Sequence, residues 1–409
     1  MITDLLSPQA VSDPHAVYRE LRENGAMTWL PEHHAWFIAT YDGVHEGFHD
    51  TRLSSDRITP LETRLSAEKR ALLGETFELL RGWMVFHDPP HHERLRGPAR
   101  RAFTPKVVEG LRPYAQKVVD ECIDRMHELA AAGEVVDLVA ELAFPLPAII
   151  IAELLGVPPS DRDAFKTWSD QLSAIVFGAS TNPQQAERAA AGSREFAAYF
   201  GELIAHYERS PGDNLISALI AARHAADPPL GASELVGACT LLLFAGHETT
   251  TGLIGNAAVT LATHPDDQAW MREHPAQTPG AVEELHRYDG SQKLMVRIVG
   301  TPHERHGQQL ERGQTVFLGT ASANRDPLMF TAPDELRLDR KDAFRHLGFG
   351  YGLHFCLGAP LARLEAQVAI GALVRRCPEL RCAIPLDEVT YGASILGRAP
   401  TSLPVAWRT

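Results

Sequence analysis

Residues 348–365 read GFGYGLHFCLGAPLARLE, and this stretch is the most informative part of the chain. After Cys356 the leucines recur at helical spacing and Pro360 suits a first turn, so the sequence predicts that a helix begins just after the cysteine. Unpaired N–H groups and the helix dipole should lower the pKa of a cysteine at this position, giving a thiolate that can ligate a metal or act as a nucleophile. Gly350 and Gly358 would let the backbone lie close to a flat ligand above the sulfur, and Phe349 would pack on its face.

Three other interpretations of this stretch compete with metal ligation. Its first glycines resemble a phosphate loop, but the pattern GxGxG lacks the GxGxxG spacing and no valine-rich strand precedes it. His354 and Cys356 could form a catalytic pair, although the sequence shows no third group to orient the histidine. The simplest alternative is a tight glycine turn beside an inert, buried thiol.

The composition is that of an ordinary globular enzyme. The chain has 409 residues, of which 44% are hydrophobic and 22% charged, and this excludes extensive disorder. Its net charge of −13 disfavours nucleic acid as a partner. We expect a cytoplasmic protein without a membrane anchor, because no secretory signal is evident and no apolar run reaches the roughly 18 residues of a membrane span. Five scattered cysteines without a CxxC pair argue against disulfides, zinc and iron–sulfur clusters.

Helix signals dominate the chain. Asp13-Pro14 begins a helix that Gly25 ends, and Thr104-Pro105 begins one that runs to about Gly133. Further helices are predicted over 161–178, 184–208, 214–226, 264–274 and 279–288. Strands are predicted as a hairpin within 27–40, in 294–319 with a turn at Gly313, and in 402–407. Because no repeat or long linker interrupts the chain, we expect residues 1–409 to form a single domain, mainly α with minor β.

A long central helix is predicted from Ser233, as N-cap, to Thr263, and it would be roughly three times the average helix length. Its middle, 241–245, is apolar and should cross the core. The polar run Gly246-His247-Glu248-Thr249-Thr250-Thr251 follows directly. An acid and three threonines inside a buried helix cost free energy unless they are paired or functional.

The string FGYGLHFCLG resembles the cysteine signature of the cytochrome P-450 family, FGxGxHxCxG, at every fixed position. This resemblance implies the P-450 fold, in which the long helix crosses a haem. It also implies haem b (iron protoporphyrin IX) as the cofactor, with a thiolate from Cys356 as the axial iron ligand and His354 hydrogen-bonded to a haem propionate.

Two other stretches resemble the family's propionate-binding motifs. They are HHERLR, with His92 and Arg96, and LMVRIV, with Arg297. Taken alone, each of these residues would be interpreted as a surface cation. The first motif also departs from the family pattern, which has acid-His-Thr where this chain has His91-His92-Glu93.

The polar run in the long helix matches the family's (A/G)Gx(D/E)T(T/S). The match implies that Ala245 and Gly246 make room for dioxygen, while Thr249 and Glu248 deliver protons for cleavage of the O–O bond. A zinc-protease HExxH motif is excluded because Thr251 stands where the second histidine would be.

Glu284 and Arg287 match the family's ExxR, which supports the cysteine loop. Arg340 is our choice for the third member of that structural network. Glu335 stands where an arginine is common in the family, so this assignment departs from the usual pattern.

The implied activity is that of a monooxygenase, which inserts one oxygen atom of dioxygen into a C–H bond of a lipophilic small molecule by hydroxylation or epoxidation. The alternatives are a peroxide-driven peroxygenase, which the intact Glu248-Thr249 pair disfavours, and a haem-based sensor. The expected substrate pocket is largely apolar and draws on Trp83, Val85, Leu242, Leu294, Met295, Val296 and Ile395.

We expect no flavin or ferredoxin module fused to the haem domain, and therefore a monomer that takes electrons from a separate ferredoxin and ferredoxin reductase, or from a flavodoxin. Docking is expected near the cysteine, on a basic patch, despite the negative net charge. The candidate residues are Arg100, Arg101, Lys106, Arg345 and Arg363, and the alternative is that they are ordinary solvated side chains.

Overall fold

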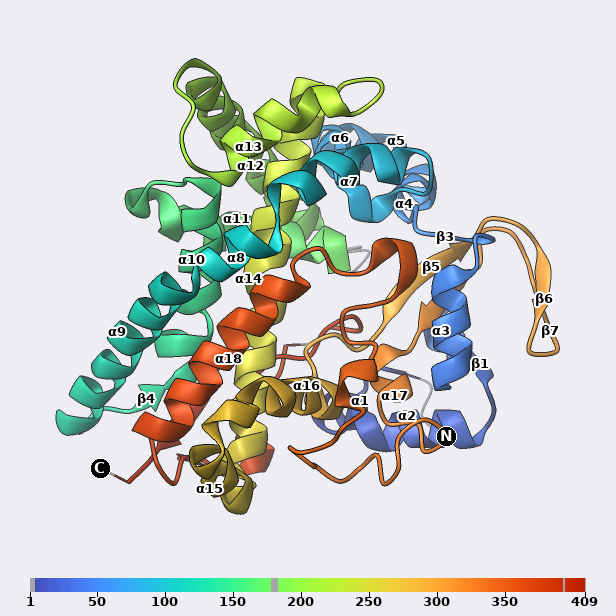
Figure 1. The fold of residues 1–409 in the computed structure, drawn as a ribbon. Helices are drawn as coiled ribbons and strands as arrows, with labels where there is room; N and C mark the ends of the chain where they lie inside the picture. The colour runs from blue at the N-terminus through green and yellow to red at the C-terminus, as the bar shows by residue number, and fades with distance from the viewer. Residues whose placement is uncertain (1–3, 178–182, 393, 409) are drawn as a thin grey trace.

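The computed structural model describes residues 4–177, 183–392 and 394–408. It is rich in helices with small sheets (Figure 1), and the predicted class, mainly α with minor β, is confirmed. The helices are α1 Pro8–Ser12, α2 Pro14–Glu23, α3 Tyr41–His49, α4 Ile58–Arg64, α5 Ala67–Leu72, α6 Gly74–Arg81, α7 His91–Ala102, α8 Pro105–Gly110, α9 Arg112–Ala131, α10 Pro145–Leu155, α11 Arg162–Phe177, α12 Pro183–Arg209, α13 Leu215–Ala222, α14 Ala232–Ala262, α15 Pro265–Glu273, α16 Thr278–Asp289, α17 Thr320–Ala323 and α18 Ala359–Arg376.

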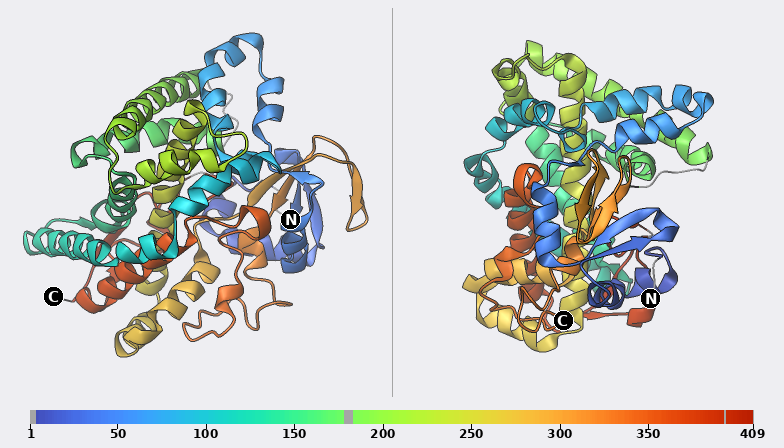
Figure 2. Two further views of the ribbon diagram at one scale, coloured as in Figure 1. Left: turned by 45° about the horizontal axis from the view of Figure 1, so that its top comes forward. Right: turned by 90° about the vertical axis from the view of Figure 1, so that its right-hand side faces the viewer.

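The strands are short: β1 Met27–Leu30, β2 Ala35–Ile38, β3 Leu53–Ser54, β4 Val136–Asp137, β5 Met295–Val299, β6 His303–Arg305, β7 Gln308–Leu310, β8 Thr315–Leu318, β9 Arg381–Cys382 and β10 Pro404–Ala406. The largest sheet has the order β1-β2-β8-β5-β3. Its first two strands form the predicted hairpin, with Met27 opposite Ile38. Gly313 has a φ of +84° and makes the predicted turn before β8, which pairs with β5. This strand-rich side faces the viewer in the right panel of Figure 2, and β5 brings the 295–297 segment to the centre of the molecule.

The predicted central helix is α14, which runs through the middle of the molecule and contacts α10 and α18 (Figure 1). Its apolar residues Leu241, Leu243 and Phe244 are buried. The predicted N-cap was wrong, because Gly231 and not Ser233 precedes the first turn. The Glu234 carboxylate reaches back and accepts a hydrogen bond from the Gly231 N–H at 2.9 Å, which favours the earlier start.

Several helices differ from the sequence prediction: α3, α4, α5 and α6 were not predicted, and proline explains two further differences. The single helix predicted from Pro105 to Gly133 is divided into α8 and α9 at Leu111. Pro113 lies in the first turn of α9, where its missing N–H is tolerated, whereas inside a continuous helix its ring would clash with the preceding turn. Conversely, α10 was not predicted, although Pro145 and Pro147 occupy its first turn, where proline is favourable.

The other predicted helices lie within a few residues of α2, α11, α12, α13, α15 and α16, although residue 178 falls outside the described residues. No helix in the described ranges is long and apolar enough to cross a membrane.

Candidate active site

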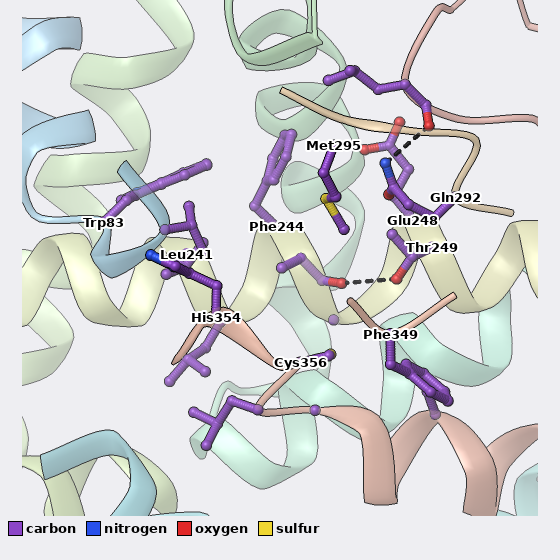
Figure 3. A pocket seen from close by; sticks show the side chains of 18 of the residues that line it. Trp83, Leu241, Phe244, Glu248, Thr249, Gln292, Met295, Phe349, His354 and Cys356 are labelled. Carbon is purple, nitrogen blue, oxygen red and sulfur yellow. Dashed lines mark hydrogen bonds between the residues drawn. The ribbon is translucent and has the colours of Figure 1, made fainter. Parts of the chain in front are cut away.

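A cavity of about 300 Å³ lies between α14, the segment before α18, and β5 (Figure 3). It brings together residues that are widely separated in sequence. Cys356 lies on one side, Thr249 and Glu248 of α14 lie across from it, and Trp83 lies at one end. The predicted residues that border the cavity are Trp83, Val85, Arg96, Leu242, Ala245, Gly246, Glu248, Thr249, Leu294, Met295, Val296, Arg297, Phe349, His354, Cys356 and Gly358.

Ile395 does not border the cavity, and its neighbour Leu396 does. Both residues pack on the cluster of apolar side chains around the N-terminal helices, but at this bend only Leu396 also reaches the cavity. The prediction of Ile395 as a pocket residue was therefore wrong by one position.

The loop before α18 holds Cys356 in a fixed position. The Cys356 N–H donates to the carbonyl of Phe349 at 2.9 Å, which closes the loop. Gly350 and Gly352 have φ values of +70° and +67°, a left-handed conformation that favours glycine. At Gly358 an added Cβ would come only to 3.9 Å from the Cys356 sulfur, which is an ordinary contact. The turn therefore requires glycine at Gly350 and Gly352, whereas crowding does not require it at Gly358.

The pKa of Cys356 differs from the sequence expectation. Burial raises the pKa of the thiol, while the N–H groups of Gly358 and Ala359 and the guanidiniums of Arg96 and Arg363 lower it by smaller amounts. The helix N-terminus therefore acts in the predicted direction, but desolvation outweighs it. A coordinated metal ion supplies the positive charge that ionises such a buried thiol.

A polar group of side chains lies beside the cysteine loop. The rings of His92 and His354 are 4.1 Å apart, and His354 Nε2 is 3.0 Å from the Ser55 hydroxyl. Burial lowers the pKa of His92 to about 4 and that of His354 to about 3, so each imidazole is a hydrogen-bonding group rather than a cation. Arg96 donates to the Phe355 carbonyl at 2.6 Å, and the buried Arg297 donates to the Val296 carbonyl.

This polar group fits haem propionates. Both ring nitrogens of His92 are buried and have no hydrogen-bond partner among the described residues, and such groups are rare in native proteins unless a bound group satisfies them. Burial lowers the pKa of Arg297 to about 10, which is the cost of keeping a guanidinium away from water. A carboxylate between these side chains would satisfy both requirements. His92, Arg96, Arg297 and His354 are therefore the residues that would hold the two propionates.

The α14 side of the cavity carries the predicted proton-transfer residues. The Thr249 hydroxyl donates to the Ala245 carbonyl at 3.2 Å, which leaves its oxygen lone pairs free to accept a hydrogen bond from the cavity (Figure 3). Glu248 borders the cavity. Burial, together with the Asp170 carboxylate, raises the pKa of Glu248 to about 7. Glu248 can therefore hold a proton at neutral pH.

Gly246 has a packing role that the sequence did not indicate. An added Cβ there would come to 2.8 Å from the Ile151 side chain on α10, so a small residue is needed where the two helices meet. Ala245 faces the cavity, as the motif implies, and Gly246 borders it.

Glu284 and Arg287 form a completely buried ion pair on α16. The Arg287 guanidinium donates to both carboxylate oxygens at 2.7 and 2.8 Å, and Arg340 Nε donates to the same carboxylate at 3.0 Å. Arg287 also donates to the Asn324 carbonyl, and the Asn324 side-chain oxygen accepts from the Leu347 N–H at 2.7 Å. The network thus connects α16 to the segment that leads into the cysteine loop.

The remaining wall of the cavity is apolar and aromatic. The Trp83 indole N–H donates to the Thr240 hydroxyl at 3.0 Å, and its ring stacks on Phe86 and contacts Phe244. Gly82 and Gly237 pack backbone to backbone, so an added Cβ on either would clash with the other. The loop that carries Trp83 is therefore held tightly against α14.

Sequence reasoning missed several polar residues that border the cavity, among them Arg57, His286 and Gln292. Gln292 donates to the carbonyls of Leu294 and Leu396 and so ties two wall segments together. His286 packs against Phe349 at 4.4 Å. None of the three belongs to a motif, so only the three-dimensional arrangement identifies them.

Comparisons with known proteins agree with this geometry. The family described as Cytochrome P450 matches residues 14–379. The chain is 39% identical to cytochrome P450 monooxygenase PikC of Streptomyces venezuelae over 98% of this chain and 93% of that protein. It is 36% identical to 6-deoxyerythronolide B hydroxylase of Saccharopolyspora erythraea over 99% and 98%. Among solved structures, myxobacterial cytochrome P450 CYP267B1 in complex with myristic acid matches with a TM-score of 0.89 and 35% identity over the whole of both chains.

Proposed function

The chain belongs to the cytochrome P450 family, whose members are haem-thiolate monooxygenases, and from this premise we propose that Cys356 is the axial ligand of its haem. The observation that carries the proposal is the position of the cysteine sulfur. It lies at the cavity, before the first turn of α18, with the N–H groups of Gly358 and Ala359 directed at it. When haem is bound there, it supplies the binding and activation of dioxygen.

We propose that Thr249 and Glu248 manage protons on the opposite side of the cavity. The Thr249 hydroxyl hydrogen is engaged by the Ala245 carbonyl, so its oxygen can orient a proton-bearing group from the cavity. Glu248, with its pKa raised to about 7, can release a proton at neutral pH and regain one. This division of roles favours a dioxygen-dependent monooxygenase over a peroxygenase, which does not need proton delivery of this kind.

The substrate class is supported by the character of the wall. Aromatic and aliphatic side chains such as Trp83, Phe244 and Met295 form most of the cavity wall. Apolar walls favour a lipophilic substrate. The related proteins PikC and 6-deoxyerythronolide B hydroxylase are named as a monooxygenase and a hydroxylase, which supports hydroxylation of a C–H bond.

The proposed function is tested by replacing the hydroxyl on α14. Thr249→Ala should retain haem but release hydrogen peroxide, with less product formed per electron consumed. Thr251→Ala is the matched control, because its hydroxyl bonds only to the His247 carbonyl. Tight coupling in Thr249→Ala, or equal turnover of the wild type with peroxide as sole oxidant, would reject the assignment.

We propose that electrons arrive from an acidic ferredoxin at the face around the cysteine loop. Arg100, Arg101, Lys106 and Arg345 are exposed, and within the described ranges none has a carboxylate within 4.0 Å. Exposed apolar side chains lie in the same region, on the cysteine loop and just before it: Phe344, Tyr351, Leu353 and Phe355. Exposed cations together with exposed apolar side chains suit an acidic protein partner.

Arg363 does not belong to this patch, and that part of the prediction was wrong. Its guanidinium makes two hydrogen bonds to the Glu283 carboxylate, at 2.7 and 2.8 Å, and lies over the Phe349 ring. It therefore holds the loop instead of facing a partner.

Charge reversal at Arg100 and Arg101 should slow reduction by ferredoxin and weaken the salt dependence of that reduction. An unchanged rate of reduction would reject this docking surface.

A further inference from the structure

Arg57 is a charged residue of the cavity that no motif explains. It lies just before α4, borders the cavity, and holds its guanidinium carbon 4.8 Å from the centre of the Phe86 ring. Within the described part of the chain, no hydrogen-bond acceptor and no carboxylate pairs with it. Burial, with a contribution from Arg297, lowers the pKa of Arg57 to about 10, which shows how poorly the protein solvates this charge.

The charges around the cavity leave Arg57 without an assigned anion. The described wall contains three guanidiniums, those of Arg57, Arg96 and Arg297, and one carboxyl, that of Glu248. Arg96 and Arg297 act on the pKa of His354 and lie with it beside the cysteine loop. These two cations match the two propionates of a haem. One positive charge therefore remains for another anion.

The surroundings of Arg57 restrict the anion. A guanidinium binds a carboxylate through two parallel hydrogen bonds, and one cation neutralises one carboxylate. A phosphate carries more charge and normally collects several donors, and the rest of the described wall offers no other unassigned cation. The neighbouring wall is apolar, because Phe86 stacks on Trp83 and Trp83 contacts Phe244.

We propose that Arg57 binds the carboxylate of the substrate, so that the enzyme acts on lipophilic monocarboxylic acids. This inference rests on the proposed function, because it takes the cavity as the substrate site. Trp83 lies at the opposite end of the cavity from Glu248 and Gln292 (Figure 3), and Arg57 lies over Phe86, whose ring stacks on Trp83. The acid group is therefore held at the Trp83 end, and the apolar chain extends toward Thr249. Oxidation is then directed to carbons remote from the carboxylate.

The test uses the purified haem-loaded protein and the absorbance change that accompanies displacement of water from the iron. Saturated fatty acids from octanoic to hexadecanoic acid are titrated, together with their methyl esters and the corresponding alcohols. The variants are Arg57→Gln, Arg57→Lys and, as a matched control on the same segment, the exposed Arg64→Gln. We expect the wild type to bind at least one acid about tenfold or more tightly than its ester.

Arg57→Gln should abolish the preference for the acid over its ester and leave the affinity for the ester unchanged. Arg57→Lys should keep part of this preference, and Arg64→Gln should keep all of it. The proposal is overturned if no acid of the series binds, or if Arg57→Gln weakens acid and ester equally. It is also overturned if Arg57→Gln keeps the preference but loses haem faster, since Arg57 would then be a propionate partner. Failure of the proposed function is a separate result, because the wild type would then lack the thiolate spectrum before any ligand is added.

Discussion

Replacing Glu284 by alanine should destabilise the protein strongly, and the structure indicates by how much. The Glu284 carboxylate is fully buried and accepts hydrogen bonds from the side chains of Arg287 and Arg340 and from the Arg337 N–H at 3.0 Å. Arg287 keeps its bonds to backbone carbonyls in the variant, but both guanidiniums lose their counter-charge. Breaking a buried pair by removing one partner costs about 3–5 kcal/mol, because an uncompensated charge remains inside.

The matched control is Glu335→Gln. Glu335 pairs with Arg337 at 2.5 Å, but both side chains are largely exposed, so its loss should cost about 1 kcal/mol or less. The free energy of unfolding would be measured in urea at equal haem content, by circular dichroism and by the haem absorption band. Because Arg287 is connected through Asn324 to Leu347, Glu284→Ala should also release haem faster. A loss below about 1 kcal/mol, equal to that of the control, would refute the reasoning.

Three further predictions concern Glu248, Trp83 and Glu365. Product formation should fall as the pH rises through about 7, because Glu248 then loses its proton. Glu248→Gln should remove this step from the pH profile. Identical pH profiles for the wild type and Glu248→Gln would contradict the proton-transfer role. Trp83→Ala should lower the free energy of unfolding by about 3–5 kcal/mol, because Trp83 is 1% exposed and hydrogen-bonded to Thr240. The variant should also bind bulkier ligands in spectral titrations. An unchanged limit on ligand size would contradict the role of Trp83 as a wall of the cavity. The Glu365 carboxyl has no hydrogen-bond partner in the described part of the chain, and burial raises its pKa well above the ordinary value of 4.5. The folded state therefore holds a proton that the unfolded state releases. Stability should therefore fall as the pH rises above about 4.5, and Glu365→Gln should flatten that decline in urea titrations at several pH values; equal slopes would show that another group is responsible.

Local patterns allowed much of the fold and site to be predicted. Short-range signals depend on neighbours in the sequence, and these located α14, the β1–β2 hairpin and the turn that presents Cys356. Where two local signals competed, the prediction was less accurate. Ser233 looked like the cap of α14, but the reach of Glu234 to the Gly231 N–H sets the start two residues earlier.

Properties that depend on burial could not be read from the sequence. The helix N-terminus suggested a lowered pKa for Cys356, but the amount of protein around the sulfur reverses the sign. The same limit applies to Glu365 and Arg57, which look like ordinary charged residues in the sequence. Only their surroundings show that the first is unpaired in the core and the second faces the cavity.

The central claim is that the Cys356 sulfur ligates the haem iron, and the spectrum of the reduced protein with carbon monoxide tests it most directly. Cys377 is a buried free cysteine that does not border the cavity, so Cys377→Ala is the control. We predict the long-wavelength band typical of thiolate ligation in the wild type and in Cys377→Ala, and its loss in Cys356→Ala. Retention of that band in Cys356→Ala would show that another residue holds the iron.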